Sequence, residues 1–366
     1  MPATPLQPVV IWFGRVGDMI LLTALLEILH RRYGRACHVI GAGSWPAQIY
    51  AAHSDVARVS ALHRYTAWLF DRAFWRLVRL LRASPQNPVY VCEMDRRKLA
   101  RIERVLRFAG IARERCLFIT EQPGITATHW VDRLVAFAKL TPPAFDARDY
   151  PWPSPPPPCA PHLEVAPAAR AKCDAWIDAR GWRGRALILV QPGNRRTMRG
   201  KRLELSAEDD KVWPTARWAE LLHRIHAHMP EAVIILCGAP RETLLLGWIA
   251  DATRLAAVAS AELPLPELFA LCASAHSMIS VDTGPAHAAA ALGLPLVVLF
   301  GANTQAEWLP RSPSGSAVIG LGGPPSSHRL DEISVDRVFD AWCSLPLVES
   351  SPPAPVKAQA ARASPP

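Results

Sequence analysis

The sequence predicts an α/β protein built from two doubly wound domains, each with a parallel sheet. Short, continuously apolar runs alternate with helical stretches along most of the chain, and such runs are typical of strands buried on both faces of a parallel sheet. The chain has 366 residues, which is enough for two domains with separate cores. A proline-rich stretch at residues 150–161 excludes both helix and central strand and separates the two halves.

The first half opens with an apolar run at residues 9–13, which we expect to be a buried strand. The glycine-containing loop at 14–18 and a buried helix at 19–29 complete the first unit of a doubly wound domain. Asp18 lies where the carboxyl ends of parallel strands meet their ligands, so it can accept a proton from a substrate hydroxyl. By position alone, a capping Asp for the following helix is the favoured interpretation.

Further strands of the first half are expected at residues 37–40, 58–62, 89–93 and 116–120, and a last helix at 129–140. The helix expected at 96–107 carries six basic residues, of which Arg97, Arg101 and Arg104 are spaced to share one face. Such a face is usually only solvated. An anion-binding surface is an equally good interpretation here, because residues 1–150 hold 21 Lys and Arg against 12 Asp and Glu.

Composition and spacing exclude several classes of protein. The basic half is compatible with nucleic acid, but helix-turn-helix, zinc-finger and RNP patterns are lacking, so we expect no nucleic-acid partner. No apolar run approaches the ~18–20 residues that span a bilayer, and the N-terminal stretch lacks the basic segment of a signal peptide. The eight cysteines form no C-x-x-C pair and the twelve histidines no H-E-x-x-H motif. We therefore expect reduced thiols, a cytoplasmic location and no structural metal.

The second half repeats the alternation of strands and helices. Strands are expected at residues 186–191, 232–237, 277–281 and 296–300, and helices at 215–228, 263–273 and 334–345. The first of these strands ends in Pro192-Gly193-Asn194, and the polar, basic stretch at 195–210 is expected to be a loop or short lid. After residue 346 the chain is rich in Pro, Ala and Ser, so we expect disorder there.

The most specific local pattern lies at residues 280–301. A strand ends in a tight turn at 282–284, and Pro285 opens a helix. The free amides and the positive dipole end of such a helix form an anion site, so a phosphate is the expected guest. Asp282 and His287 add polar side chains around that end. An ordinary strand-to-helix crossover is nevertheless the better interpretation of the pattern taken alone.

Together, the motifs resemble those of glycosyltransferase family 9, the heptosyltransferases of bacterial lipopolysaccharide core assembly. They are Gly17-Asp18, Pro192-Gly193, Lys211-Val212-Trp213-Pro214, Gly238-Ala239-Pro240-Arg241-Glu242, and Asp282-Thr283-Gly284-Pro285-Ala286-His287 with the Leu-Gly-x-Pro and Leu-Phe-Gly that follow. The resemblance extends over about residues 9–339. It implies the GT-B fold, in which two Rossmann-like domains with parallel sheets face each other across a cleft.

On this basis we expect five segments. They are an acceptor-binding domain at 1–150, a linker with a connecting helix at 151–184, a nucleotide-sugar-binding domain at 185–330, a closing helix at 331–345 and a disordered tail at 346–366.

The resemblance also implies site residues. Asp18 matches the family's proposed general base, and Lys211 is expected to neutralise the departing diphosphate, although a surface Lys before a helix is the plain alternative. The expected donor-binding residues are Gly193, Glu242, Asp282, Thr283, Gly284 and His287. For Glu242, a ribose contact and a first-turn Glu that favours the helix dipole are equally good interpretations. Arg97, Arg101 and Arg104 are the expected acceptor-binding residues.

The activity implied is an inverting transfer that needs neither metal nor cofactor. It would move heptose from ADP-heptose, a nucleotide-diphospho-sugar, to a lipopolysaccharide core or a related anionic, lipid-linked glycan, with peripheral contact at the cytoplasmic face of the inner membrane. Two alternatives stay open, namely another nucleotide sugar and a non-catalytic nucleotide- or glycan-binding protein. A nicotinamide-dependent oxidoreductase is disfavoured, because residues 14–19 read Gly-Arg-Val-Gly-Asp-Met and lack the G-x-G-x-x-G fingerprint.

The sequence also departs from the family pattern at two places. The basic stretch at 195–210 is longer than in the simplest members, which bears on contacts near the anomeric centre. The strand at 89–93 ends in Cys-Glu-Met-Asp-Arg, where the family commonly has an Asp-containing end followed by small residues. This second departure bears on the identity of the acceptor.

Overall fold

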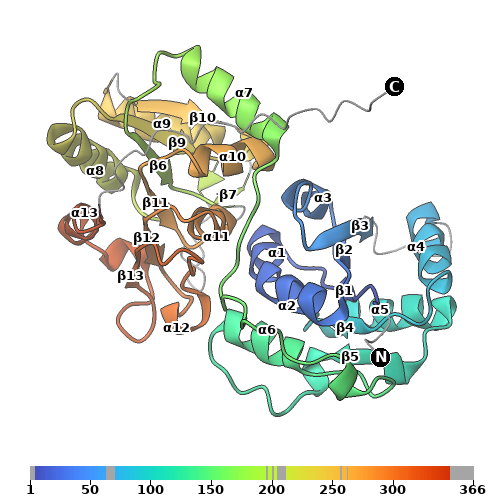
Figure 1. Cartoon of the computed structure of the whole chain (residues 1–366). Coiled ribbons are helices and arrows are strands. Elements are labelled where there is room, and N and C mark those ends of the chain that lie inside the picture. The colour runs from blue at the N-terminus through green and yellow to red at the C-terminus, as the bar shows by residue number, and fades with distance from the viewer. Residues whose placement is uncertain are drawn as a thin grey trace, which may run out of the picture.

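The computed structural model contains two parallel sheets, one in each half of the chain (Figure 1). It describes residues 5–62, 71–194, 197–199, 202–203, 212–255, 258–261 and 263–346. Within these ranges, no helix combines the length and the apolar composition that crossing a bilayer requires.

The first sheet has five parallel strands in the order β3-β2-β1-β4-β5. Their bounds are β1 Val9–Ile11, β2 Cys37–Ala42, β3 Val56–Leu62, β4 Val89–Val91 and β5 Cys116–Phe118. Alternate residues of the first strand enter different cores, with Val10 in one and Val9 and Ile11 in the other. Because successive side chains of a strand face opposite sides of the sheet, the continuous apolar run is buried on both faces.

Helices cover both faces of this sheet. They are α1 Val16–Leu21, α2 Thr23–Tyr33, α3 Trp45–Ile49, α4 Arg72–Arg82, α5 Arg96–Ala109 and α6 Trp130–Lys139. Helices α2 and α6 pack together on one face, and α4 and α5 on the other. The stretch expected as one helix at 19–29 is helical but divided, because α1 ends and α2 begins on either side of Leu22. There the Thr23 hydroxyl donates to the carbonyl of Ile20 at 2.7 Å, an alternative to the regular helical ladder.

The second sheet has six parallel strands in the order β10-β9-β6-β11-β12-β13. Their bounds are β6 Leu187–Gln191, β9 Val233–Cys237, β10 Val258–Ala261, β11 Ser277–Val281, β12 Leu296–Phe300 and β13 Val318–Gly322. The two edge strands, β10 and β13, were not expected from the sequence. The glycines of β13, Gly320 and Gly322, lower strand propensity and hide the signal, whereas β10 is only four residues long.

Helices also cover both faces of the second sheet. They are α7 Pro167–Asp178, α8 Thr215–His228, α9 Thr243–Thr253, α10 Leu265–Cys272, α11 Gly284–Ala291, α12 Gln305–Trp308 and α13 Val335–Cys343. One core contains α8, α9 and α13, and the other contains α7, α10 and α11. Short 3-10 helices occur at Arg113–Arg115, Ile119–Glu121, Ala147–Asp149, Pro240–Glu242 and Leu330–Glu332.

Part of the expected loop at 195–210 forms a small antiparallel pair, β7 Met198–Arg199 with β8 Arg202–Leu203. The rest of that segment lies outside the described residues. So does the expected disordered tail beyond residue 346.

The linker between the two sheets runs in an extended path from the first domain to α7 (Figure 1). It is attached along its length, since the guanidinium of Arg31 donates to the carbonyl of Pro155 and the amide of His162 donates to the Thr23 hydroxyl at 3.0 Å. The next amide, of Leu163, donates to the carbonyl of Ala291 at the end of α11 at 3.3 Å. The linker therefore touches both domains.

The domains meet where α1 contacts α11. Residues of α10 and α11, including Phe269, Ala288 and Ala291, are part of the same core as α1 and α2. A second contact joins α6 to the segment after α12, where Arg311 donates to both oxygens of Asp132 at 2.6 and 2.8 Å. Because α1 follows β1 and α11 follows β11, the carboxyl ends of the two sheets face each other.

Candidate active site

Asp18 lies in the first turn of α1, directly after β1. Its Oδ2 atom accepts the amide of Arg15 at 2.7 Å. Arg15 is the N-cap of α1 and Asp18 is its third residue, so the expectation that Asp18 itself is the N-cap is wrong, although its side chain does satisfy an amide at the helix start. Gly14 makes room for it, because a Cβ at that position would lie 2.5 Å from the Asp18 Cβ. Burial raises the pKa of the Asp18 carboxyl above its ordinary value, although the Arg15 amide and the charges of Arg15 and Lys98 oppose the rise. A raised pKa suits a general base.

The start of α11 has the features of an anion site. Thr283 is the N-cap in an extended conformation, and Gly284 and Pro285 begin the helix. The first bond inside the helix is donated by Ala286 to the Thr283 carbonyl at 3.1 Å, so the amides of Thr283 and Gly284 precede the helical ladder. Asp282 is buried, and its Oδ2 accepts a hydrogen bond from the side-chain Nδ2 of Asn303 at 2.6 Å.

The structure brings these two elements into contact. A Cβ on Gly17, the residue before Asp18, would lie 3.2 Å from His287 Cδ2 and 3.7 Å from Gly284 Cα. His287 is 5% exposed, so its ring is enclosed at this junction. The loop that carries the candidate base and the helix start that suits a phosphate are therefore adjacent, although they are far apart in the sequence.

Gly193 and Glu242 form a second pair at the ends of the adjacent strands β6 and β9. Oε2 of Glu242 accepts the amide of Ala239 at 2.8 Å, so the first-turn role of this Glu is present. Its Oε1 atom is buried and has no hydrogen-bond partner among the described residues. A Cβ on Gly193 would lie 2.6 Å from that oxygen, so only glycine leaves it space. Burial raises the pKa of the Glu242 carboxyl.

Lys211 lies outside the described residues. The rest of its motif, Val212-Trp213-Pro214, lies within the described residues. Trp213 is fully buried, donates its indole N–H to the carbonyl of Ile333 at 2.9 Å and packs against Trp218. Trp213 is therefore a packing residue that anchors the end of this segment to the second domain.

The three candidate acceptor-binding arginines of α5 differ in their surroundings. Arg97 is exposed and Arg104 is half-buried, but Arg101 is only 6% exposed. Its guanidinium lies 3.6 Å from the carboxylate of Asp71, the N-cap of α4. The expectation of one solvent-facing arginine surface is thus wrong for Arg101, because α4 packs over this side of α5.

Two residues beside Asp18, Glu93 and Lys98, were not predicted as site residues, although Glu93 lies in the strand end that departs from the family pattern. Glu93, buried at the end of β4, accepts the amide of Phe13 with Oε2 at 3.1 Å and those of Met94 and Asp95 with Oε1 at 3.1 and 3.0 Å. Lys98 donates to the carbonyl of Phe13 at 2.9 Å and lies 3.6 Å from Glu93. The sequence feature that could have identified Glu93 is an acidic residue at the end of the strand next to β1, because neighbouring parallel strands end at the same edge of a sheet.

Comparisons with known proteins agree with this arrangement. The chain matches the model of glycosyltransferase family 9 (heptosyltransferase) over residues 127–332. It is 34% identical over 105 residues to lipopolysaccharide heptosyltransferase 3 of Escherichia coli, a match that covers 28% of this chain and 31% of the relative. The chain thus matches about a third of that relative's length.

Two solved structures share the fold across both domains. One is E. coli ADP-heptose lipopolysaccharide heptosyltransferase II, with 20% identity, a TM-score of 0.67 and coverage of 92% of this chain and 98% of that one. The other is E. coli heptosyltransferase WaaC with ADP, with 18% identity, a TM-score of 0.63 and the same coverage. The fold is therefore GT-B, as the sequence motifs implied. With a family model that matches more than half of its length, this chain belongs to glycosyltransferase family 9.

Proposed function

We propose that this protein is an inverting, metal-independent glycosyltransferase that moves heptose from ADP-heptose to a lipopolysaccharide core or a related anionic glycan. The observation that carries the proposal is the contact of Gly17 with Gly284 and His287, which sets the Asp18 loop beside the start of α11. The family match supports sugar transfer, and the names of the relatives, which are heptosyltransferases, support the choice of ADP-heptose as the donor.

The proposed reaction is a single displacement at the anomeric carbon. The acceptor hydroxyl oxygen forms the new bond on the face opposite the leaving group, and its proton passes to the Asp18 carboxylate. The bond from the anomeric carbon to the diphosphate breaks, and its electron pair goes to the diphosphate oxygen. The amides at the start of α11 and the Lys211 ammonium stabilise that charge, which is the task a metal ion performs in other transferases.

Glu242 and Gly193 are proposed to hold the nucleoside of the donor. Oε1 of Glu242 is the buried acceptor that a ribose hydroxyl would satisfy. The acceptor glycan is proposed to lie on the first domain, near Arg97, Arg104 and Lys98, with the protein at the cytoplasmic face of the inner membrane. The excess of basic residues in the first half supports this placement.

The test is a transfer assay with ADP-heptose and lipopolysaccharide core acceptor in the presence of EDTA, together with thermal shifts by ADP, UDP, GDP, CMP and NAD. Asp18→Asn should lower kcat by about 10²–10⁴-fold and leave the ADP shift unchanged. Asp146→Asn is the matched control, because Asp146 also accepts a backbone amide, that of Arg148 at 2.9 Å, from an exposed position. It should retain full activity.

Each alternative function has its own outcome. Near-normal turnover of Asp18→Asn would remove Asp18 as the base. Selective stabilisation by another nucleoside diphosphate would change the sugar but keep the mechanism. A nucleotide shift without any transfer would indicate a non-catalytic binding protein, and a shift with NAD alone would indicate an oxidoreductase.

A further inference from the structure

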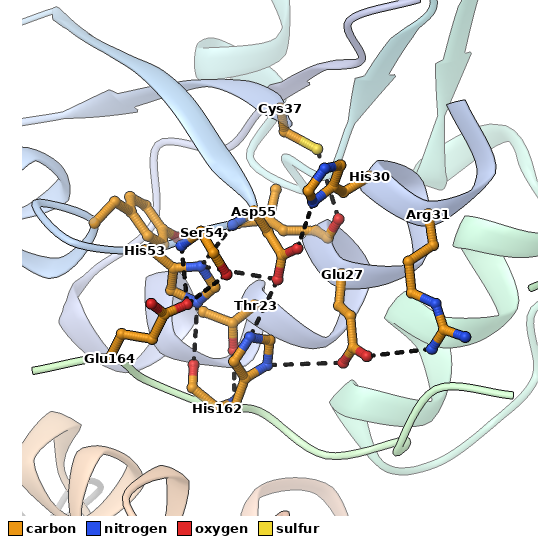
Figure 2. A network of polar contacts seen from close by, with 12 residues as sticks. Thr23, Glu27, His30, Arg31, Cys37, His53, Ser54, Asp55, His162 and Glu164 are labelled. Carbon is orange, nitrogen blue, oxygen red and sulfur yellow. Dashed lines mark hydrogen bonds and ion pairs between the residues drawn. The ribbon is translucent and has the colours of Figure 1, made fainter. Parts of the chain in front are cut away.

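A cluster of metal-ligand side chains lies where the linker meets the first domain (Figure 2). Among the described residues, His53, Asp55 and His162 offer ligand atoms that all lie within 4.8 Å of one another. His53 and Asp55 come from the segment just before β3, and His162 comes from the linker. Spacing along the chain therefore gave no sign of this group, and the expectation of no structural metal was made without it.

We propose that His53, Asp55 and His162 form a binding site for one divalent transition-metal ion, with Zn²⁺ as the best fit. Two imidazoles and one carboxylate are ligands of the type that Zn²⁺ takes in proteins, at about 2.0–2.2 Å. That bond length places ligand atoms of a tetrahedral site roughly 3.3 Å apart.

Both distances from the histidine nitrogens to the Asp55 carboxylate are within about 0.5 Å of that value, and all three ligand atoms lie within 4.8 Å of one another. Nε2 of His162 lies 3.1 Å from Oδ2 of Asp55, and Nδ1 of His53 lies 3.8 Å from the same oxygen. The Asp55 amide donates to Nδ1 of His53 at 3.3 Å, so the metal would replace that long contact. Because the His53 contact is the longer of the two, binding of an ion would require the His53 side chain to move toward Asp55.

The groups around the ligands are those that orient metal sites. The other nitrogen of His53, Nε2, lies 3.3 Å from the carbonyl of His162, and the second oxygen of Asp55 bonds to Nδ1 of His30 at 2.7 Å. The buried Nδ1 of His162 has no hydrogen-bond partner among the described residues and lies 3.8 Å from the carboxylate of Glu27. Metal-bound imidazoles commonly donate their second N–H to a carbonyl or carboxylate in this way.

Solvent can reach the site from one side. The side chain of His53 is fully buried and that of Asp55 is 9% exposed, whereas that of His162 is 23% exposed. The ion would therefore enter past His162, and the fourth ligand would be water. Because residues 162–164 also contact Thr23, Ser54 and Ala291, a bound ion would hold the linker against the first domain next to the end of α11.

The test measures metal binding by the full-length, untagged protein and is independent of the sugar-transfer proposal. After dialysis against EDTA and then buffer, calorimetric titration with ZnCl₂ should show one equivalent bound and a rise in Tm. His162→Ala should lower the affinity by at least about tenfold. Glu27→Gln keeps all three ligands and should lower it about ten- to a hundredfold by losing the group that orients His162.

Two controls exclude other sites. His223→Ala removes an exposed histidine of α8 in the other domain and should bind as the wild type does. Cys159→Ser combined with Cys343→Ser removes the two exposed thiols and should also leave binding intact. A Co²⁺ complex should show visible d–d bands without a thiolate charge-transfer band.

Any one of three results would overturn the inference. They are the absence of a one-equivalent site in the wild type, unchanged affinity in both His162→Ala and Glu27→Gln, and loss of binding in the double cysteine variant. In the first case the cluster is a hydrogen-bond network that attaches the linker without an ion.

Discussion

The Asp18 carboxylate accepts a hydrogen bond at the start of a helix and also lies in a position where burial disfavours its charge. Its Oδ2 accepts the Arg15 amide, which favours the ionised form, but burial has the larger effect and raises the pKa. Gly14 is the local reason that this position is possible, since any side chain there would overlap with Asp18. Folding therefore removes part of the water around the half-buried Asp18 carboxylate.

The raised pKa predicts that Asp18 lowers stability at neutral pH. The folded protein binds this proton more tightly than the unfolded chain, so the destabilisation is complete above the raised pKa and disappears as the pH falls below the unfolded value of 3.8. Asp18→Asn should therefore have a higher Tm than the wild type at pH 7, and the difference should shrink toward pH 4. In the wild type, kcat/KM should fall as the pH falls through the same raised pKa, because kcat/KM reports the ionisation of the free enzyme.

Calorimetry at several pH values checks the first expectation, with Asp146→Asn as the control. Burial does not dominate at Asp146, where Arg148 lowers the pKa to about 2. The Asp146 variant should accordingly not gain stability at pH 7. A lower Tm for Asp18→Asn at pH 7 would contradict the burial argument.

At the scale of elements, the contact between α1 and α11 depends on glycines. A Cβ on Gly284 would lie 2.9 Å from Val16 Cγ1 and 3.2 Å from the backbone nitrogen of Gly17. The backbone of one domain thus approaches the helix start of the other more closely than a side chain allows. This approach sets the Asp18 loop beside the amides of α11.

Gly284→Ala should therefore push the two helices apart. We expect a loss of about 1–3 kcal/mol in the free energy of unfolding, the usual cost of overpacking, together with weaker ADP binding. Denaturant unfolding and ADP titration measure the two effects.

Gly247→Ala is the matched control, because Gly247 lies within α9 and a Cβ there meets nothing within 4 Å. It should gain about 0.5–1 kcal/mol, since alanine favours a helix more than glycine does. Equal stability of the two variants would show that α1 and α11 can separate without cost.

At the scale of the whole molecule, charge and apolar exposure are unevenly distributed. The first half holds the entire excess of basic residues. On the same domain, Trp75 of α4 and Phe108 of α5 are 37% and 36% exposed, with ring centroids 5.5 Å apart. Arginines of both helices, among them Arg76 and Arg107, are exposed near them in the sequence. Aromatic rings beside arginines suit the interface of an anionic membrane.

This distribution predicts salt-sensitive binding to vesicles that contain anionic lipid. Affinity should fall as ionic strength rises, because screening weakens the attraction of the basic domain. Trp75→Ala should weaken binding by about tenfold through loss of inserted apolar area. Trp248→Ala, which removes a similarly exposed ring from the second domain, should bind like the wild type. Vesicle cosedimentation measures the binding. Equal effects of the two variants would contradict the prediction that the first domain is the one that faces the membrane.

Local pattern was sufficient for most strands and for the motifs. The buried runs that became β1, β6, β11 and β12 are continuous in the sequence, and Pro285 marked the start of α11. Strand propensity, helix periodicity and capping depend on neighbours in the chain, so they are legible without a structure. The edge strand β13 escaped because its glycines hide the signal, and β10 because it is only four residues long. The break at Leu22 lies beside a side-chain bond, that of Thr23 to the carbonyl of Ile20.

The sequence by itself therefore determined the fold class, the family, and where along the chain the Asp18 loop and the start of α11 lie. Only the tertiary structure decided that Gly17 touches His287, that Arg101 is turned toward Asp71, and that His162 reaches Asp55. Each of these contacts joins residues from different elements. Their positions follow from strand order, domain contact and the path of the linker, which no local spacing in the chain encodes.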